Sequence, residues 1–208
     1  MATSKPPYNR SVFINCPFDD DYVPLFQAII FTLFILDFTP RSAFEIDDGG
    51  IRLAKIIKII NGCKFGIHDI SRTEPDLVNH LPRFNMPFEL GLDIGCKLLS
   101  DRSRHREKVH LILDKDKHRF RIYLSDISGQ DIKAHSDDPR QIIRVVRDWL
   151  RYAADHMPSA TFVTKEYDMF HSQLGRICFE LNLDHGGHTF VDYCHIVQTW
   201  LNERKQNA

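Results

Sequence analysis

Short apolar runs alternate with helix-length segments along the first half of the chain, and this alternation limits the possible folds more than any other feature. Four runs have the length and apolar character of buried strands, at residues 11–16, 42–46, 63–68 and 109–113. Helix-length segments lie between them, at residues 23–36, 51–61 and 85–99. Strands and helices that alternate in this way build a parallel sheet with helices on both faces. We therefore expect an α/β fold with a doubly wound parallel sheet of about five strands.

The pattern weakens after the fourth run. Residues 120–124 could add a strand, and helices are expected at residues 139–153 and near residues 164–181 and 189–204. The expected organisation has three parts: a flexible lead-in at residues 1–10, an α/β domain at residues 11–153, and a helical C-terminal extension at residues 154–208 that packs on the domain.

The composition is that of a globular chain, with 43% hydrophobic residues and a formal net charge of −1 at pH 7. Because there is no excess of positive charge, we do not expect a nucleic-acid partner. The five cysteines are odd in number and form no C-x-x-C pair, which favours reduced thiols in the cytoplasm. The longest apolar stretch, residues 23–38, is interrupted by Gln27, Thr32 and Asp37 and is shorter than the roughly 20 residues of a membrane helix. We expect neither a membrane anchor nor a targeting peptide.

A sheet of this kind binds its ligand at the carboxyl ends of its strands. In this chain those ends are the segments 15–22, 45–50, 68–72 and 113–117, and three of the four have an unusual polar sequence. In the second segment, Asp48 lies in the turn after the predicted strand and is a candidate substrate-binding residue. The topology alone therefore predicts where the site is.

The first candidate element is the turn N-C-P-F-D-D at residues 15–20. The Asn15 amide and the backbone N–H groups of the turn would face the crevice and could cradle a ribose or a phosphate, with Pro17 and Phe18 beside them. In the alternative interpretation, Pro17 only ends the strand, and Asp19 and Asp20 cap the helix that follows.

The second candidate element is H-D-I-S-R at residues 68–72, also at a strand end. Asp69 could accept hydrogen bonds from sugar hydroxyls, as acidic residues at strand ends do in nucleotide-binding folds. In the alternative, Asp69 forms an Asx turn and only holds the loop in place.

The third and strongest candidate element is L-P-R-F-N-M-P-F-E-L-G at residues 81–91. Asn85 suits the N-cap of a helix and Pro87 its first turn, which puts Glu89 in the first turn or two. The helix dipole there favours an anionic carboxylate. Near a bound sugar, such a carboxylate can attack or stabilise an oxocarbenium-like centre, as in glycoside cleavage. Acidic residues are also common near helix starts without any function, and that alternative stays open.

The histidines show no metal-binding pattern. His185 and His188 flank two glycines, and His105 and His110 lie on either side of a loop, but neither pair has a carboxylate or thiol at ligand spacing. The chain also has no Walker A, G-x-S-x-G or G-x-G-x-x-G motif. We expect no metal.

Three segments in order, F-I-N-C-P-F, C-K-F-G-I-H-D-I-S and P-F-E-L-G, resemble the motifs of the nucleoside 2-deoxyribosyltransferase-like and Toll/interleukin-receptor (TIR)-like superfamily. The resemblance covers about residues 11–115. It implies a flavodoxin-like sheet and cleavage of an N-glycosidic bond by a glutamate. It places that glutamate at Glu89, the acidic residue of the third strand's end at Asp69, and the first turn at residues 15–18.

The chain departs from the family pattern at two places. Residues 84–87, F-N-M-P, replace the small Gly-Thr pair before the catalytic helix, and Lys64 stands where the transferases often have aspartate. These departures favour a larger dinucleotide over a nucleoside, with Phe84 or Met86 against a base.

The leading hypothesis is therefore an NAD(P) glycohydrolase that releases nicotinamide, with NAD as substrate and no cofactor. Glu89 would be catalytic, Asn15 and Asp69 would join Ser71 in holding ribose hydroxyls, and Arg72 or Arg83 would meet the pyrophosphate. The full set expected to bind substrate is Asn15, Pro17, Phe18, Asp48, Asp69, Ser71, Arg72, Arg83, Asn85 and Met86.

The resemblance further implies a homo-oligomer or an assembly with a partner protein, and a role as a bacterial antiphage effector. Two alternatives remain. One is a nucleoside or nucleotide deoxyribosyltransferase or hydrolase that uses the same Glu89. The other is a non-catalytic nucleotide-sensing or scaffold module, whose partner surface could include Trp149, Tyr193 and Trp200 unless these aromatics are core residues.

Overall fold

The computed structural model describes residues 6–45, 49–75, 80–154 and 156–206. These residues form one five-stranded sheet in the order β2-β1-β3-β4-β5, and every neighbouring pair of strands is parallel. The chain starts in the interior at β1, goes to β2 at one edge, and returns to add β3, β4 and β5 on the other side. The strands are β1 (Ser11–Asn15), β2 (Thr39–Arg41), β3 (Phe65–Asp69), β4 (Val109–Asp114) and β5 (Lys133–Ala134). The predicted α/β class and doubly wound parallel sheet are confirmed, and the arrangement is consistent with a flavodoxin-like fold.

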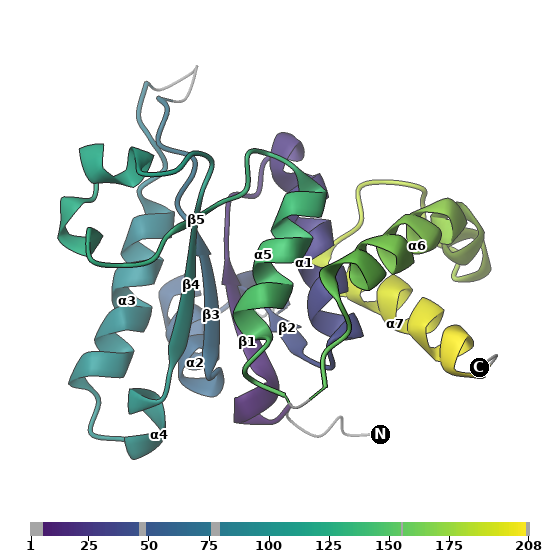
Figure 1. The fold of residues 1–208 in the computed structure, drawn as a ribbon, viewed down its shortest axis with the longest axis horizontal. Helices are drawn as coiled ribbons and strands as arrows, with labels where there is room; N and C mark the ends of the chain where they lie inside the picture. The colour runs from purple at the N-terminus through teal and green to yellow at the C-terminus, as the bar shows by residue number, and fades with distance from the viewer. Residues whose placement is uncertain (1–5, 46–48, 76–79, 155, 207–208) are drawn as a thin grey trace.

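Helices cover both faces of this sheet (Figure 1). On one face, α2 and α3 contact each other and strands β1 and β3, and on the other, α1 contacts α5. The helices are α1 (Val23–Ile35), α2 (Arg52–Gly62), α3 (Asn85–Leu99), α4 (Ser103–Arg106), α5 (Pro139–Leu150), α6 (Ala160–Glu180) and α7 (Phe190–Gln206). Short 3₁₀ helices are η1 (Tyr8–Arg10), η2 (Asp20–Tyr22), η3 (Ala43–Glu45), η4 (Arg119–Ile122) and η5 (Ser125–Ile127).

The two-residue period of β1 explains the two-sided core. Val12 and Ile14 belong to the hydrophobic cluster on the α1 side, whereas Phe13 belongs to the cluster with Ile56 and Ile59 of α2. Every residue of β1 is buried. A strand buried on both faces needs apolar residues on both, which is why Val12, Phe13 and Ile14 follow one another without polar alternation.

Helices α6 and α7 form a further layer outside α1 (Figure 1). Phe31 of α1 packs against Phe170 of α6 and Trp200 of α7, with ring centroids 5.2 and 5.7 Å away. Tyr193 and Trp200 are 2% and 1% exposed, so they belong to the core and not to a partner surface. α1 packs against the sheet on one side and against α6 and α7 on the other, so apolar residues extend nearly all round the helix.

Two predicted strands are wrong. In the described part of residues 42–46, the chain forms the 3₁₀ helix η3, and the strand β2 comes just before it. β2 contains Pro40, whose missing N–H is tolerated because β2 is an edge strand. Residues 120–124 lie mostly in η4, and the other edge strand, β5, has only two residues. Within the described ranges, no helix is both long and apolar enough to cross a membrane.

Candidate active site at the switch point of the sheet

The strand order reverses direction between β1 and β3, and doubly wound sheets bind their ligands beside that point. Asn15 ends β1 and Asp69 ends β3, so both predicted candidates lie at the carboxyl edge. Both are buried, at 1% and 0% exposure. Their contacts therefore decide whether they face a ligand or the protein itself.

Asn15 attaches helix α3 to the sheet. Its Nδ2 donates to the main-chain oxygen of Met86 at 2.8 Å and to His68 Nδ1 at 3.1 Å. Its Oδ1 is buried and has no hydrogen-bond partner in the described part of the chain. The side chain that the sequence assigns to ribose binding thus holds the start of the helix that carries Glu89.

Glu89 lies on α3 at 7% exposure, one turn beyond the residue that Asn15 holds. Its carboxyl group makes no hydrogen bond or ion pair with any residue that the structure describes. Burial raises the pKa of Glu89 to about 7, and the positive charge of Arg52 opposes that rise. A carboxyl group with this pKa is present in both protonation states at neutral pH, which suits proton transfer or charge stabilisation.

Four residues further along α3, Asp93 fixes the same helix face with a buried ion cluster. His68 Nε2 donates to Asp93 Oδ2 at 3.0 Å, and the Lys108 ammonium lies 3.0 Å from Oδ1. Burial alone would raise the pKa of Asp93, but the contacts of its carboxylate with His110 and His68 and the charge of Lys108 hold that pKa well below its usual range. Burial lowers the pKa of His68. Glu89 is therefore placed between two polar anchors of α3, the Met86 carbonyl and the Asp93 carboxylate.

The same cluster has the composition of a metal site. Ligand atoms of His68, Asp93 and His110 all lie within 4.8 Å of one another, a grouping that the sequence pattern does not reveal. Lys108 argues against a metal here, because its fully buried ammonium also donates to the main-chain oxygens of Ile60 and Cys63. A divalent cation would lie beside this buried positive charge, so we interpret the group as an ion cluster.

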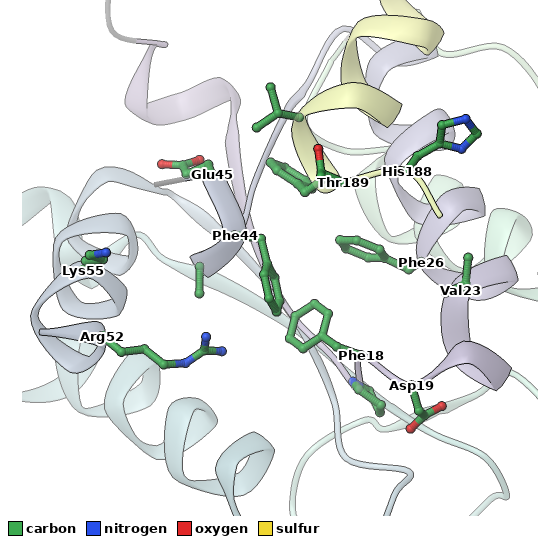
Figure 2. Close-up of a pocket in the computed structure, with 14 residues that line it drawn as sticks. Phe18, Asp19, Val23, Phe26, Phe44, Glu45, Arg52, Lys55, His188 and Thr189 are labelled. Atoms are coloured by element: carbon green, nitrogen blue, oxygen red, sulfur yellow. The ribbon is translucent and has the colours of Figure 1, made fainter. Parts of the chain in front are cut away.

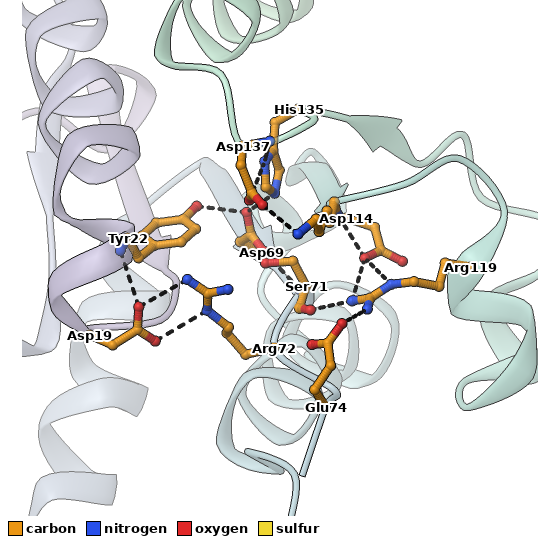
Figure 3. A network of polar contacts seen from close by, with 11 residues as sticks. Asp19, Tyr22, Asp69, Ser71, Arg72, Glu74, Asp114, Arg119, His135 and Asp137 are labelled. Atoms are coloured by element: carbon orange, nitrogen blue, oxygen red, sulfur yellow. Dashed lines mark hydrogen bonds and ion pairs between the residues drawn. The ribbon is translucent and has the colours of Figure 1, made fainter. Parts of the chain in front are cut away.

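Asp69 is the centre of a second buried network (Figure 3). Tyr22 donates its hydroxyl to Asp69 Oδ2 at 2.6 Å, and the backbone N–H of Ser71 donates to Oδ1 at 2.8 Å. His135 Nε2 lies 3.0 Å from Oδ2. Asp69, at the end of β3, thus links η2 to the residue that follows β5. Its bond to the backbone of Ser71 is the one that the Asx-turn alternative expects.

The two predicted phosphate-binding arginines both lie near Asp19, and Figure 3 shows the contact of Arg72. Arg72 donates two hydrogen bonds to the Asp19 carboxylate, at 3.1 and 3.2 Å. Arg83 is more exposed and lies 3.8 Å from the same carboxylate. Asp19 also accepts a hydrogen bond from the backbone N–H of Tyr22 and so caps the short helix η2. The alternative interpretation expected Asp19 and Asp20 to cap α1, but the N-cap of α1 is Tyr22. Asp19 already neutralises much of the charge that Arg72 would offer a phosphate.

A cavity of ≈770 Å³ opens beside this edge of the sheet (Figure 2). Pro17 and Phe18, two of the predicted residues, form one wall. The other walls come from elements that the sequence did not connect with the site: the start of α1, η3, α2 and the segment 188–191 at the start of α7. Its volume is within the roughly 300–1,000 Å³ of small-molecule sites.

The remaining predicted residues lie in different environments. Met86 is 5% exposed and packs in the core beneath α3, whereas Phe84 is 64% exposed, so solvent reaches only Phe84 of the two proposed base contacts. Asn85 is exposed and is the first residue of α3 instead of its N-cap. Asp48 lies outside the described residues.

Sequence reasoning missed Phe44, Arg52 and Phe190, which line the cavity. Phe44 falls in the segment misassigned as a strand, and Phe190 opens a helix whose packing the sequence does not indicate. Comparison of the chain with protein-family models, with curated proteins and with solved structures finds no match in any of the three.

Proposed function

We propose that this protein cleaves the N-glycosidic bond of a nucleotide, with NAD(P) as the leading substrate, and that Glu89 is the catalytic group. One observation carries the proposal: Glu89 is a buried carboxyl group without a partner among the described residues, at the switch point of the sheet. Burying such a group costs stability, and unpaired ionisable groups of this kind concentrate at functional sites.

The chemistry needs only one carboxylate and water. The bond between C1′ of the ribose and the nicotinamide nitrogen breaks, and nicotinamide leaves with the bonding electron pair and becomes neutral. Glu89 stabilises or attacks the positive ribosyl C1′, and water then adds there and releases one proton. The products are nicotinamide, the ADP-ribosyl group with a hydroxyl at C1′, and that proton.

The state of Glu89 decides the pH dependence. A carboxylate that stabilises or attacks C1′ must be ionised, so turnover would rise with pH through about 7 as Glu89 loses its proton. A general acid would give the opposite slope. The internal contacts of Asn15 and Asp69 make them positioning residues in this mechanism, since Asn15 fixes α3 and Asp69 fixes the loop after β3.

The test is incubation of the purified protein, at low and high concentration, with NAD, NADP and a panel of nucleosides, followed by chromatography. Glu89→Gln keeps the shape and removes the charge. Glu107→Gln is the matched control. The Glu107 side chain is 66% exposed and lies just before β4, at the amino ends of the strands, whereas the candidate site is at their carboxyl ends. We expect nicotinamide release that Glu107→Gln keeps and Glu89→Gln loses.

Other outcomes are also decisive. Full turnover in Glu89→Gln would eliminate the mechanism. Exchange or release of bases from nucleosides, with NAD left intact, would establish the deoxyribosyltransferase or nucleosidase alternative. Tight nucleotide binding without product at any protein concentration, unchanged in Glu89→Gln, would establish a non-catalytic module.

A further inference from the structure

The cavity beside the switch point has one continuous aromatic wall (Figure 2). Phe190 of α7 stacks on Phe26 of α1, with centroids 5.9 Å apart and planes at 27°. Phe26 meets Phe18 edge to face at 5.6 Å, and Phe18 meets Phe44 edge to face at 4.1 Å. Phe44 is 43% exposed although it is a large apolar side chain. These rings come from four separate segments and present apolar surface to an open cavity.

A guanidinium group adjoins the exposed end of this wall. Arg52 lies over the Phe44 ring, with Cζ 5.3 Å from the centroid, and also lines the cavity. The two acidic residues of the lining are already held by arginines: Asp19 by Arg72, and Glu45 by Arg41 at 2.6 Å. The polar side of the cavity is therefore suited to an anion near Arg52.

We propose that this cavity binds the planar base of a nucleotide against Phe18 and Phe44, with the phosphate at Arg52, and that the start of α7 is its specificity-determining wall. A planar base is stabilised by burial and by edge or face contacts with phenylalanine rings. A guanidinium group can donate two parallel hydrogen bonds to phosphate oxygens. A ligand that has a phosphate but no planar base, or a base but no phosphate, would contact either Arg52 or the phenylalanines but not both.

This assignment deepens the proposed function and rests on it for the link to catalysis. Arg52 lines the cavity, and its positive charge lowers the pKa of Glu89, so one side chain is linked to both. A substrate with its base in the cavity and its phosphate at Arg52 would extend toward Glu89 with its next ribose. The substrate is thus a nucleotide with a group beyond its phosphate, and not a free nucleoside.

The test measures binding before turnover. AMP and ribose 5-phosphate are titrated by calorimetry into the full chain, into Val191→Arg and into Phe179→Arg. Val191 is 54% exposed and lines the cavity, so the larger side chain obstructs it without entering the core. Phe179 is 81% exposed on α6 and outside the lining, and it is the control.

We expect AMP to bind the native chain and Phe179→Arg equally, at least tenfold more tightly than ribose 5-phosphate does, and Val191→Arg to lose tenfold or more. AMP binding should survive in Glu89→Gln. No AMP binding to the native chain, equal affinity for the two probes, or unchanged binding by Val191→Arg would each overturn the assignment.

The two proposals fail separately. If nicotinamide release depends on Glu89 but Val191→Arg keeps the native KM for NAD, the base site is wrong and the catalytic proposal stands. If no substrate turns over but AMP binding is lost in Val191→Arg, the base site stands and the catalytic proposal is wrong.

Discussion

Replacing Glu89 by glutamine should make the protein more stable at alkaline pH than at acidic pH, relative to the native chain. Burial raises the pKa of Glu89 to about 7 from its ordinary 4.5. Below pH 4.5 the carboxyl group is protonated in both the folded and the unfolded chain, so its ionisation does not change the free energy of unfolding. Between the two values only the unfolded chain releases the proton, so native stability falls as the pH rises, and above about 7 the loss is complete.

The size of this loss follows from the two pKa values. With 4.5 for the unfolded chain and about 7 for the folded protein, ionisation of Glu89 costs about 0.8 kcal/mol at pH 5 and about 3.3 kcal/mol at pH 8. Glutamine cannot ionise, and its own effect on packing and hydrogen bonding is the same at both values. The stability of Glu89→Gln relative to the native chain should therefore improve by about 2.5 kcal/mol between pH 5 and pH 8.

The assay is urea unfolding of both proteins at pH 5 and pH 8, with Glu107→Gln carried through as the control. Comparing differences between pH values cancels the other titrating groups and any constant cost of the glutamine. Glu107→Gln should show no comparable change, because its side chain is 66% exposed. If Glu89→Gln has the same stability relative to the native chain at both pH values, Glu89 is not a buried carboxyl group with a raised pKa.

Three further predictions concern the anchors and the outer layer. Lys108→Met should cost about 3–5 kcal/mol of unfolding free energy by urea denaturation, because it leaves the Asp93 carboxylate buried without its ammonium; a loss below about 1 kcal/mol would refute the ion-cluster interpretation. Gly66→Ala should cost about 1–3 kcal/mol in the same assay, because the added Cβ would lie 2.5 Å from Asp93 Oδ2 and 2.7 Å from His68 Nε2; an unchanged midpoint would contradict this packing. Trp200→Ala should cost about 3–5 kcal/mol and still give a single calorimetric transition; two resolved transitions would mean that α6 and α7 unfold separately.

The main elements of the sheet could be predicted because their sequences agree with their positions. β1 and β3 are fully buried, as are the last four residues of β4, so all three strands are mainly apolar in sequence. α1 was predicted at residues 23–36, against the observed Val23–Ile35. The edge strands could not be found in this way. β2 has three residues with a proline at its centre, and β5 has two, so neither is long enough to show a period.

The burial of charged residues could not be predicted from the sequence either. Asp93 and Lys108 look like ordinary surface residues of a helix and a charged loop, yet both are fully buried. Their burial depends on one another and on His68, which is 25 residues from Asp93 in the chain. Charged pairs that become favourable only after the fold has formed leave no local signal.

At the candidate site, the sequence predicted a ligand at the carboxyl ends of the strands and a catalytic role for Glu89, and both stay predictions. The expected contacts of Asn15 and Asp69 with a substrate differ from the structure, in which protein groups occupy both side chains. The place of Phe190 in the cavity could not be predicted, because nothing in residues 154–208 indicates that the start of α7 borders the turn after β1.

The position of α1 has a consequence for synthesis on the ribosome. This helix is made before the helices that cover it, α5, α6 and α7, and all five strands but β1 are made in between. Its apolar surface must stay exposed while these elements are translated. A nascent chain of this kind is prone to aggregate before completion, and C-terminal truncations should share that fate. The outermost helices therefore protect the first one, and the chain is a poor candidate for trimming to a minimal α/β domain.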